Sequence, residues 1–134
     1  MNILIVAAHP DDEVLGCGGI VSRLVKEGST AYAFHFVGAY SSRDTEQESP
    51  ELMSIRATEI MGVSKIFPHQ FPDQKLDTVP FLDLVKAVEE VKNEVKPDII
   101  FTHYEHDLNL DHRLAYQAVV TATRPMADET VKYI

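Results

Sequence analysis

Short apolar segments alternate along this chain with longer stretches in which apolar residues recur at helical spacing. Residues 3–8 are continuously apolar, which is typical of a strand buried on both faces of a sheet. Before Pro97, apolar residues recur every three or four positions and predict a helix with one face on a core. They are Phe81, Leu84, Val85, Val88, Val91 and Val95. Strands that alternate with helices predict βαβ units and a mostly parallel sheet.

The rest of the chain follows the same alternation. We expect strands at residues 3–8, 31–37, 65–67 and 98–102, with a further strand opening at 131–134. We expect helices at about 13–27, 50–62, 81–95 and 111–124, and loops at 40–49 and 68–77. These elements predict an α/β fold of the Rossmann-like, three-layer kind.

Composition narrows the class of protein. A chain of 134 residues is long enough for one domain with a real core. Its net charge of -9 argues against a nucleic-acid partner, because a phosphate backbone is bound by clustered Lys and Arg. Cys17 is the only cysteine, so no intramolecular disulfide can form. No stretch has the pattern of a signal peptide or the length of a membrane span, and we therefore expect a cytoplasmic protein.

The first group of polar residues with chemical potential follows the first expected strand. His9 and Asp12 stand three residues apart across a strand-to-helix turn and can converge on one metal ion. Asp11, between them, would be left to act as a base. Acidic residues also favour helix starts for structural reasons, and capping is the alternative explanation of the two aspartates. His9 directly before them favours the metal.

The second group lies in residues 103–112, where three histidines and two aspartates fall within ten positions. A packed structural histidine is the usual explanation of any one of them, but it explains the cluster poorly. Asp111 could orient an imidazole or could cap the following helix. Parallel sheets bind ligands beyond the carboxyl ends of their strands, and His9 and His103 each directly follow an expected strand. Both groups therefore stand where a site is expected.

Together the two segments resemble the zinc-dependent N-acetylglucosaminyl deacetylases of the PIG-L or LmbE-like family. The first motif is Ala-His-Pro-Asp-Asp-Glu at residues 8–13, followed by Leu-Gly-Cys-Gly-Gly at 15–19. The second ends in Asp-His-Arg at 111–113 and comes after a Pro-Asp-Ile-Ile-Phe-Thr-His strand at 97–103. Residues 56–63 also look like the family's Arg-x-x-Glu helix ending in Gly-Val. The resemblance covers nearly the whole chain in order.

The resemblance implies a role for particular residues. His9, Asp12 and His112 match three ligands of a Zn²⁺ ion, for which Fe²⁺ is an alternative in vivo. Asp11 matches the general base. Arg56 and Asp73 match residues that contact the substrate, although Arg56 could instead pair with Glu59, and Asp73 could belong to a turn after Pro72.

One position departs from the family. A histidine commonly stands three residues before the last metal ligand, where it helps to stabilise the reacting oxygen, and this chain has Asn109 there. An asparagine can donate a hydrogen bond to an oxyanion but cannot shuttle a proton. Either Asn109 supplies the donor or His106 approaches from the loop.

The function implied by the resemblance is zinc-dependent removal of an N-acetyl group from a small amino-sugar substrate such as N-acetylglucosamine or its conjugate. Two alternatives stay open: a metal-dependent amidase for another N-acyl substrate, and a metal-binding domain without catalysis. A Rossmann-like nucleotide binder is disfavoured, because no glycine-rich turn separates the first strand from the first helix.

The end of the chain carries a further expectation. The sequence stops at Ile134, just as a strand begins, whereas members of the resembled family continue beyond this point. We therefore expect residues 1–134 to be the N-terminal part of such a deacetylase domain. We expect this part to bind zinc but to hydrolyse substrate poorly. An open strand edge would also favour association into homo-oligomers.

Overall fold

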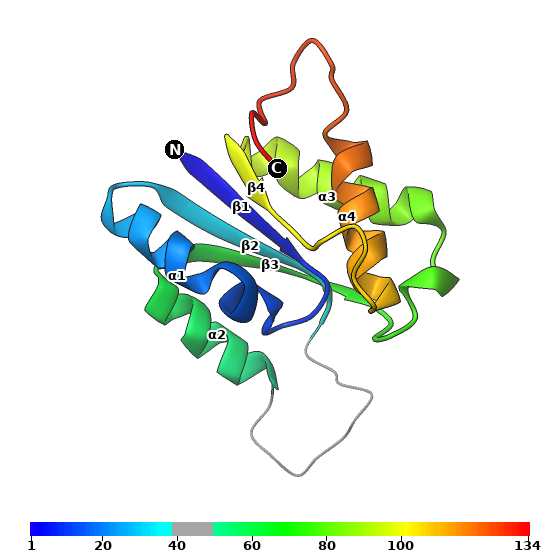
Figure 1. The fold of residues 1–134 in the computed structure, drawn as a ribbon, viewed down its shortest axis with the longest axis horizontal. Helices are drawn as coiled ribbons and strands as arrows, with labels where there is room; N and C mark the ends of the chain where they lie inside the picture. Colours follow the sequence, from blue (N-terminus) through cyan, green and yellow to red (C-terminus); the bar gives the residue numbers. More distant parts are fainter. Residues whose placement is uncertain (39–49) are drawn as a thin grey trace.

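The computed structural model describes residues 1–38 and 50–134 (Figure 1). The strands are β1 (Asn2–Ala7), β2 (Thr30–Val37), β3 (Val63–Phe71) and β4 (Ile99–Phe101). The helices are α1 (Asp12–Lys26), α2 (Pro50–Met61), α3 (Phe81–Val95) and α4 (Leu110–Ala122), with a short 3-10 helix at Leu76–Thr78. The loop expected at residues 40–49 lies outside the described residues.

The four strands form one parallel sheet in the order β3-β2-β1-β4. Helices α1 and α2 cover one face of this sheet, and α3 and α4 cover the other (Figure 1). The arrangement confirms the predicted α/β fold with three layers and a parallel sheet.

Strand β1 shows why its sequence is apolar at every position. Leu4 and Val6 pack into the core beneath α3 and α4, whereas Ile3 and Ile5 pack into the core beneath α1 and α2. Successive side chains of a strand point to opposite faces, so a strand covered on both sides needs apolar residues throughout. β1 therefore contributes side chains to two hydrophobic cores, one on each face of the sheet.

Strand β3 is longer than its sequence predicts. The expected strand at residues 65–67 is wrong in length, because β3 runs from Val63 to Phe71 and includes Pro68, which the sequence pattern places in a loop. β3 is an edge strand that pairs only with β2 in the described sheet, and a proline without an N–H is tolerated at an edge. Pro68 pairs with His35, and the register then shifts before Val37.

The last residues approach the other edge of the sheet. Tyr133 forms a single parallel bridge with Ile99, and the Ile100 N–H donates to the Tyr133 carbonyl at 3.0 Å. The strand expected at 131–134 is thus represented by one bridge beside β4. Among the described helices, none combines the length and apolar character that crossing a membrane requires.

The strand order has a switch point between β1 and β4. From β1 the chain adds β2 and then β3 on one side, and β4 returns to pair with β1 on the other side. Connections after β1 and β4 therefore leave toward opposite faces of the sheet, into α1 and α4. Such a switch point, at the carboxyl ends of neighbouring strands, is where open α/β sheets bind ligands.

Candidate metal centre

The turn between β1 and α1 places His9 and Asp12 against each other. The His9 backbone N–H donates to Asp12 Oδ2 at 2.9 Å, which holds that carboxylate beside the His9 ring. Asp11 precedes the first residue of α1 and has φ of 141° and ψ of -28°. Its side chain makes no capping hydrogen bond to the described backbone. The capping explanation therefore does not account for Asp11.

Helix α4 brings a second imidazole to this turn. His112 Nε2 lies 3.3 Å from His9 Nδ1 and 3.5 Å from Asp12 Oδ1, and His9 Nδ1 lies 3.5 Å from Asp12 Oδ2. A tetrahedral ion with bonds of about 2.0–2.1 Å holds its ligands about 3.3 Å apart. These three side chains therefore have both the chemistry and the mutual spacing that fit one metal ion.

The far side of the His9 ring is held by acidic and amide groups. His9 Nε2 lies 3.1 Å from Oδ2 of Asp111, 3.3 Å from Oδ1 of Asp73 and 3.2 Å from Nε2 of Gln74. Asp111 is buried, and its other carboxylate oxygen accepts the Leu76 N–H at 3.1 Å. This carboxylate can fix the proton of His9 on Nε2 and so leave the Nδ1 lone pair for a metal.

A second group of His9, Asp73 and Asp111 is also compact enough to hold an ion, through the other nitrogen of the same ring. A neutral imidazole carries a proton on one nitrogen and can offer only the other as a ligand. The short contact to the buried Asp111 marks Nε2 as the proton-bearing nitrogen. The geometry therefore favours the group that uses His9 Nδ1.

The structure decides between the two sequence-based explanations of Asp111. It orients the imidazole of His9, which is 102 residues away in sequence. The cap of α4 is Asn109, whose side-chain oxygen accepts the Asp111 N–H at 2.9 Å. His112 faces a different carboxylate, because its Nδ1 lies 3.2 Å from Asp107 Oδ2.

His103 also belongs to this cluster, although the sequence assigned it no role. Its ring stacks on His112 with centroids 4.0 Å apart, and its Nε2 accepts the Ala8 N–H at 2.8 Å. Burial lowers the pKa of His103 to about 4, so the ring is neutral at neutral pH and Nε2 is already engaged. The signal was present in the sequence, because His103 follows the β4 segment closely.

Charges within the cluster shift the pKa values of its members. Burial alone would lower the pKa of His9, but hydrogen bonds and charges from Asp111 and Asp12 outweigh it and raise the pKa to about 9. Burial would raise the pKa of Asp12, and the hydrogen bonds to His9 lower it on balance. Burial, with the nearby Asp12 and Glu13 carboxylates, raises the pKa of Asp11. The cluster thus concentrates negative charge around two imidazoles.

Of the remaining predicted site residues, one lies in the cluster and two lie at the surface. Asp73 contacts His9, so the structure brings it into the cluster. Arg56 is exposed on α2. His106 lies at the surface, with 72% of its side chain exposed, and contacts Glu105 at 3.5 Å. Gln74 was missed by the sequence analysis, since a glutamine in a loop carries no distinctive pattern.

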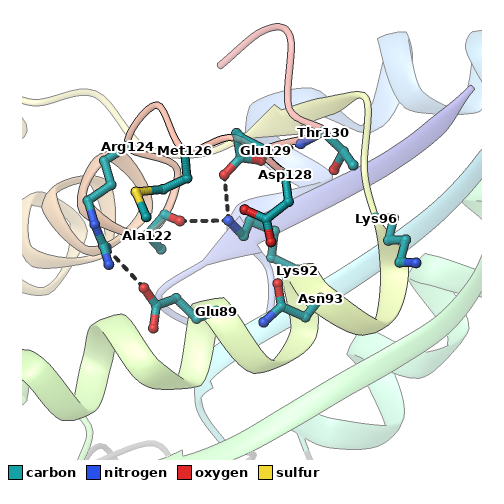
Figure 2. Close-up of a pocket in the computed structure, with 10 residues that line it drawn as sticks. All are labelled: Glu89, Lys92, Asn93, Lys96, Ala122, Arg124, Met126, Asp128, Glu129 and Thr130. Carbon is teal, nitrogen blue, oxygen red and sulfur yellow. Dashed lines mark hydrogen bonds and ion pairs between the residues drawn. The ribbon is translucent and has the colours of Figure 1, made fainter.

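A second polar hollow lies between α3 and the segment that follows α4 (Figure 2). There Lys92 Nζ donates to the Ala122 carbonyl at 2.8 Å and pairs with the Glu129 carboxylate, while Arg124 pairs with Glu89 at 3.0 Å. These pairs of opposite charge tie the last residues of the chain to α3. The residues that line this hollow therefore form an ion-pair network with a structural role.

Comparison with known proteins agrees with the fold. The family model described as PIG-L, GlcNAc-PI de-N-acetylase, matches residues 4–123. An Escherichia coli (strain K12) protein described as an uncharacterized deacetylase, YaiS, is 31% identical over 128 residues, which cover 92% of this chain and 68% of that protein. A Bacillus cereus protein described as a probable N-acetyl-alpha-D-glucosaminyl L-malate deacetylase 2 is 29% identical over 139 residues, covering 96% of this chain and 63% of its own.

Among solved structures, the N,N'-diacetylchitobiose deacetylase from Pyrococcus horikoshii superposes with a TM-score of 0.70 and 26% identity. The match covers 96% of this chain and 52% of that one. The chain therefore spans only part of the length of each of these three proteins.

Proposed function

We propose that this chain, which belongs to the PIG-L (GlcNAc-PI de-N-acetylase) family, hydrolyses the N-acetyl group of an acetylated amino sugar or its conjugate with the help of a bound metal ion. The names of its relatives support N-deacetylation, and two of those names specify N-acetylated sugars. The single observation that carries the proposal is the convergence of two imidazoles and one carboxylate at 3.3–3.5 Å.

The metal would be held by His9, Asp12 and His112. Imidazole nitrogen and carboxylate oxygen suit Zn²⁺, and Fe²⁺ in vivo accepts the same donors. When bound, such an ion acts as a Lewis acid that polarises the acetyl carbonyl and makes water nucleophilic near neutral pH. Asp111 and Asp107 would orient the two imidazoles from behind.

Asp11 would serve as the general base. It is exposed, it stands next to Asp12, and its pKa is raised, which brings a carboxylate nearer to the value that favours proton transfer. Its carboxylate would take a proton from water as the water oxygen adds to the acetyl carbon. The same proton would pass to the amine nitrogen as the C–N bond breaks, giving acetate and a free amino sugar.

Hydrogen-bond donors near the carbonyl oxygen would come from Asn109 or His106. Asn109 uses its side-chain oxygen to cap α4, and its amide nitrogen is a donor. His106 would have to move in from the surface. We propose Arg56 and Asp73 as contacts of the sugar, because an arginine fork and a carboxylate both suit sugar hydroxyls.

The test combines metal analysis with acetate release. Purified chain should contain about one Zn²⁺ or Fe²⁺ ion and should release acetate from one or more members of a panel of N-acetylated amino sugars. N-acetylated amino acids, presented in the same assay, probe the amidase alternative. Hydrolysis of the amino acids alone would replace the sugar proposal, and stoichiometric metal with no hydrolysis of either class would leave a metal-binding domain. A chain that stays metal-free at saturating zinc would contradict the proposed site.

A further inference from the structure

The side chain of Glu13 is buried beside the candidate metal centre, and the proposed chemistry does not use it. It is 1% exposed and stands in the first turn of α1. Moving a carboxylate out of water is costly unless hydrogen bonds and charges compensate it. The groups that contact the Glu13 carboxylate therefore indicate what this buried charge does in the protein.

Three different elements meet at this carboxylate. Oε1 accepts a hydrogen bond from the Ser54 hydroxyl of α2 at 3.2 Å. Oε2 lies 3.1 Å from Nε2 of His35, a buried residue of β2. Oε2 also accepts the backbone N–H of Asp11 at 3.0 Å. The carboxylate thus links the turn that carries Asp11 to the body of the fold.

That turn has a backbone that needs support. Asp11 has φ of 141°, which side-chain-bearing residues rarely adopt. Such conformations cost about 1–3 kcal/mol and persist where the surrounding structure fixes them. The hydrogen bond to Glu13 acts directly on the N–H of the strained residue. The carboxylate is in turn held by the hydrogen bond from Ser54 and by the close contact with the His35 ring.

We propose that Glu13, anchored by His35 and Ser54, is a positioning residue that holds the backbone of Asp11 so that its carboxylate faces the metal centre. The proposal rests on the proposed function, in which Asp11 moves the proton. Glu13 itself touches neither metal nor substrate. It acts by fixing the direction in which the neighbouring base points, and small misplacements of a base cost large factors in rate.

The first measurement does not depend on catalysis. Hydrogen exchange of the Asp11 amide, followed by NMR on the 134-residue chain, reports the Glu13 hydrogen bond directly. Glu13→Ala should speed that exchange roughly tenfold, the worth of about one hydrogen bond. Glu13→Gln, which keeps a carbonyl acceptor, should restore most of the protection. Thr58→Val is the matched control. Thr58 lies on α2 and is buried like Glu13, and within the described residues its hydroxyl donates to carbonyls of its own helix.

The second measurement is steady-state kinetics with metal content determined on the same samples. Glu13→Ala should lower kcat by about 10²-fold with KM and metal content nearly unchanged, and Glu13→Gln should recover much of that loss. Thr58→Val should lose no more activity than its folded fraction explains.

The outcomes separate this proposal from the proposed function. Unchanged Asp11 exchange in Glu13→Ala would overturn the positioning role, whether or not the chain is a deacetylase. Faster exchange with unchanged kcat would overturn it as well, because the held backbone would then not matter to the base. Loss of metal in Glu13→Ala would show that the residue supports the ligand set and not the base. Wild-type protein that hydrolyses nothing would refute the function while the exchange result still stood.

Discussion

Two polar clusters lie at opposite ends of α4, and their composition differs in kind. At the carboxyl ends of β1 and β4, two histidines and an aspartate bring nitrogen and oxygen atoms within 3.3–3.5 Å of one another. Between α3 and the last residues, Lys92 and Arg124 each meet a glutamate (Figure 2). Opposite charges in the second cluster satisfy one another. The first cluster presents only nitrogen and oxygen atoms that can bind a metal, and its negative charge would be compensated by a bound cation.

The first cluster has the composition of a metal centre, whereas the second joins the segment after α4 to α3. Lys92 and Glu129 are 13% and 9% exposed, and His9 and Asp12 are 14% and 17% exposed, so burial alone does not distinguish the two clusters. The two clusters are distinguished by the atoms that face each other: ligating nitrogen and oxygen atoms in the first, and oppositely charged groups in the second.

His112→Ala should remove the metal and with it essentially all hydrolysis, because two ligands rarely hold zinc in water. Metal content per chain, measured after dialysis, should fall from about one to near zero. Lys92→Met is the comparison variant and should keep its metal. A His112→Ala chain that retains stoichiometric metal and activity would remove His112 from the ligand set.

Asp11→Asn should keep the metal and lower kcat by about 10²–10⁴-fold, the usual contribution of a general base. The amide preserves the shape of the side chain but accepts no proton. Kinetics and metal analysis on one preparation test both halves of the statement. Loss of the metal in this variant would instead make Asp11 a ligand and bring the role of Asp12 into question.

Zinc affinity should rise about tenfold per pH unit between pH 7 and 8, because the ion displaces the proton that His9 holds. The pKa of His9 in the metal-free protein is about 9, above its ordinary value near 6.5. A raised pKa means that the pairing of His9 with Asp111 and Asp12 stabilises the metal-free fold fully below pH 6.5. That contribution is lost as the pH rises through 9.

Calorimetry at two pH values and in two buffers measures both the affinity and the protons released per zinc. Asp111→Asn removes one of the groups that raise the pKa of His9 and should weaken the pH dependence. Affinity that does not change between pH 7 and 8 in the wild-type chain would contradict proton displacement from His9.

Lys92→Met should destabilise the fold by about 1.5–3 kcal/mol, because the lysine makes two charge-assisted hydrogen bonds near the C-terminal segment. Metal content and kcat of the folded protein should be unchanged. Denaturant unfolding gives the free energy. Arg124→Gln, at an exposed pair, is the matched control and should cost less than about 1 kcal/mol. Altered kcat in Lys92→Met would show that the two ends of α4 are coupled.

The sequence by itself determined the elements whose signal is local. Continuous apolar residues in β1 and helical spacing in α3 depend only on neighbours in the chain, so those elements were predicted close to their observed bounds. The pairing of His9 with Asp12 is also local, since the two residues are separated by one turn. The length of β3 was misjudged, because tolerance of Pro68 depends on being at an edge, and only the strand order decides which strand is at an edge.

Tertiary structure decided everything that joins distant segments. The return of β4 to the side of β1 brings His112 within 3.3 Å of His9, over a separation of 103 residues. It also assigns Asp111 to His9 and Asp107 to His112, which sequence proximity would not have suggested. Strand order is set by the burial of both sheet faces, a property of the whole chain, and no local pattern carries it. For the same reason the meeting of Glu13, His35 and Ser54 became visible only when β2 and α2 packed against the first turn of α1.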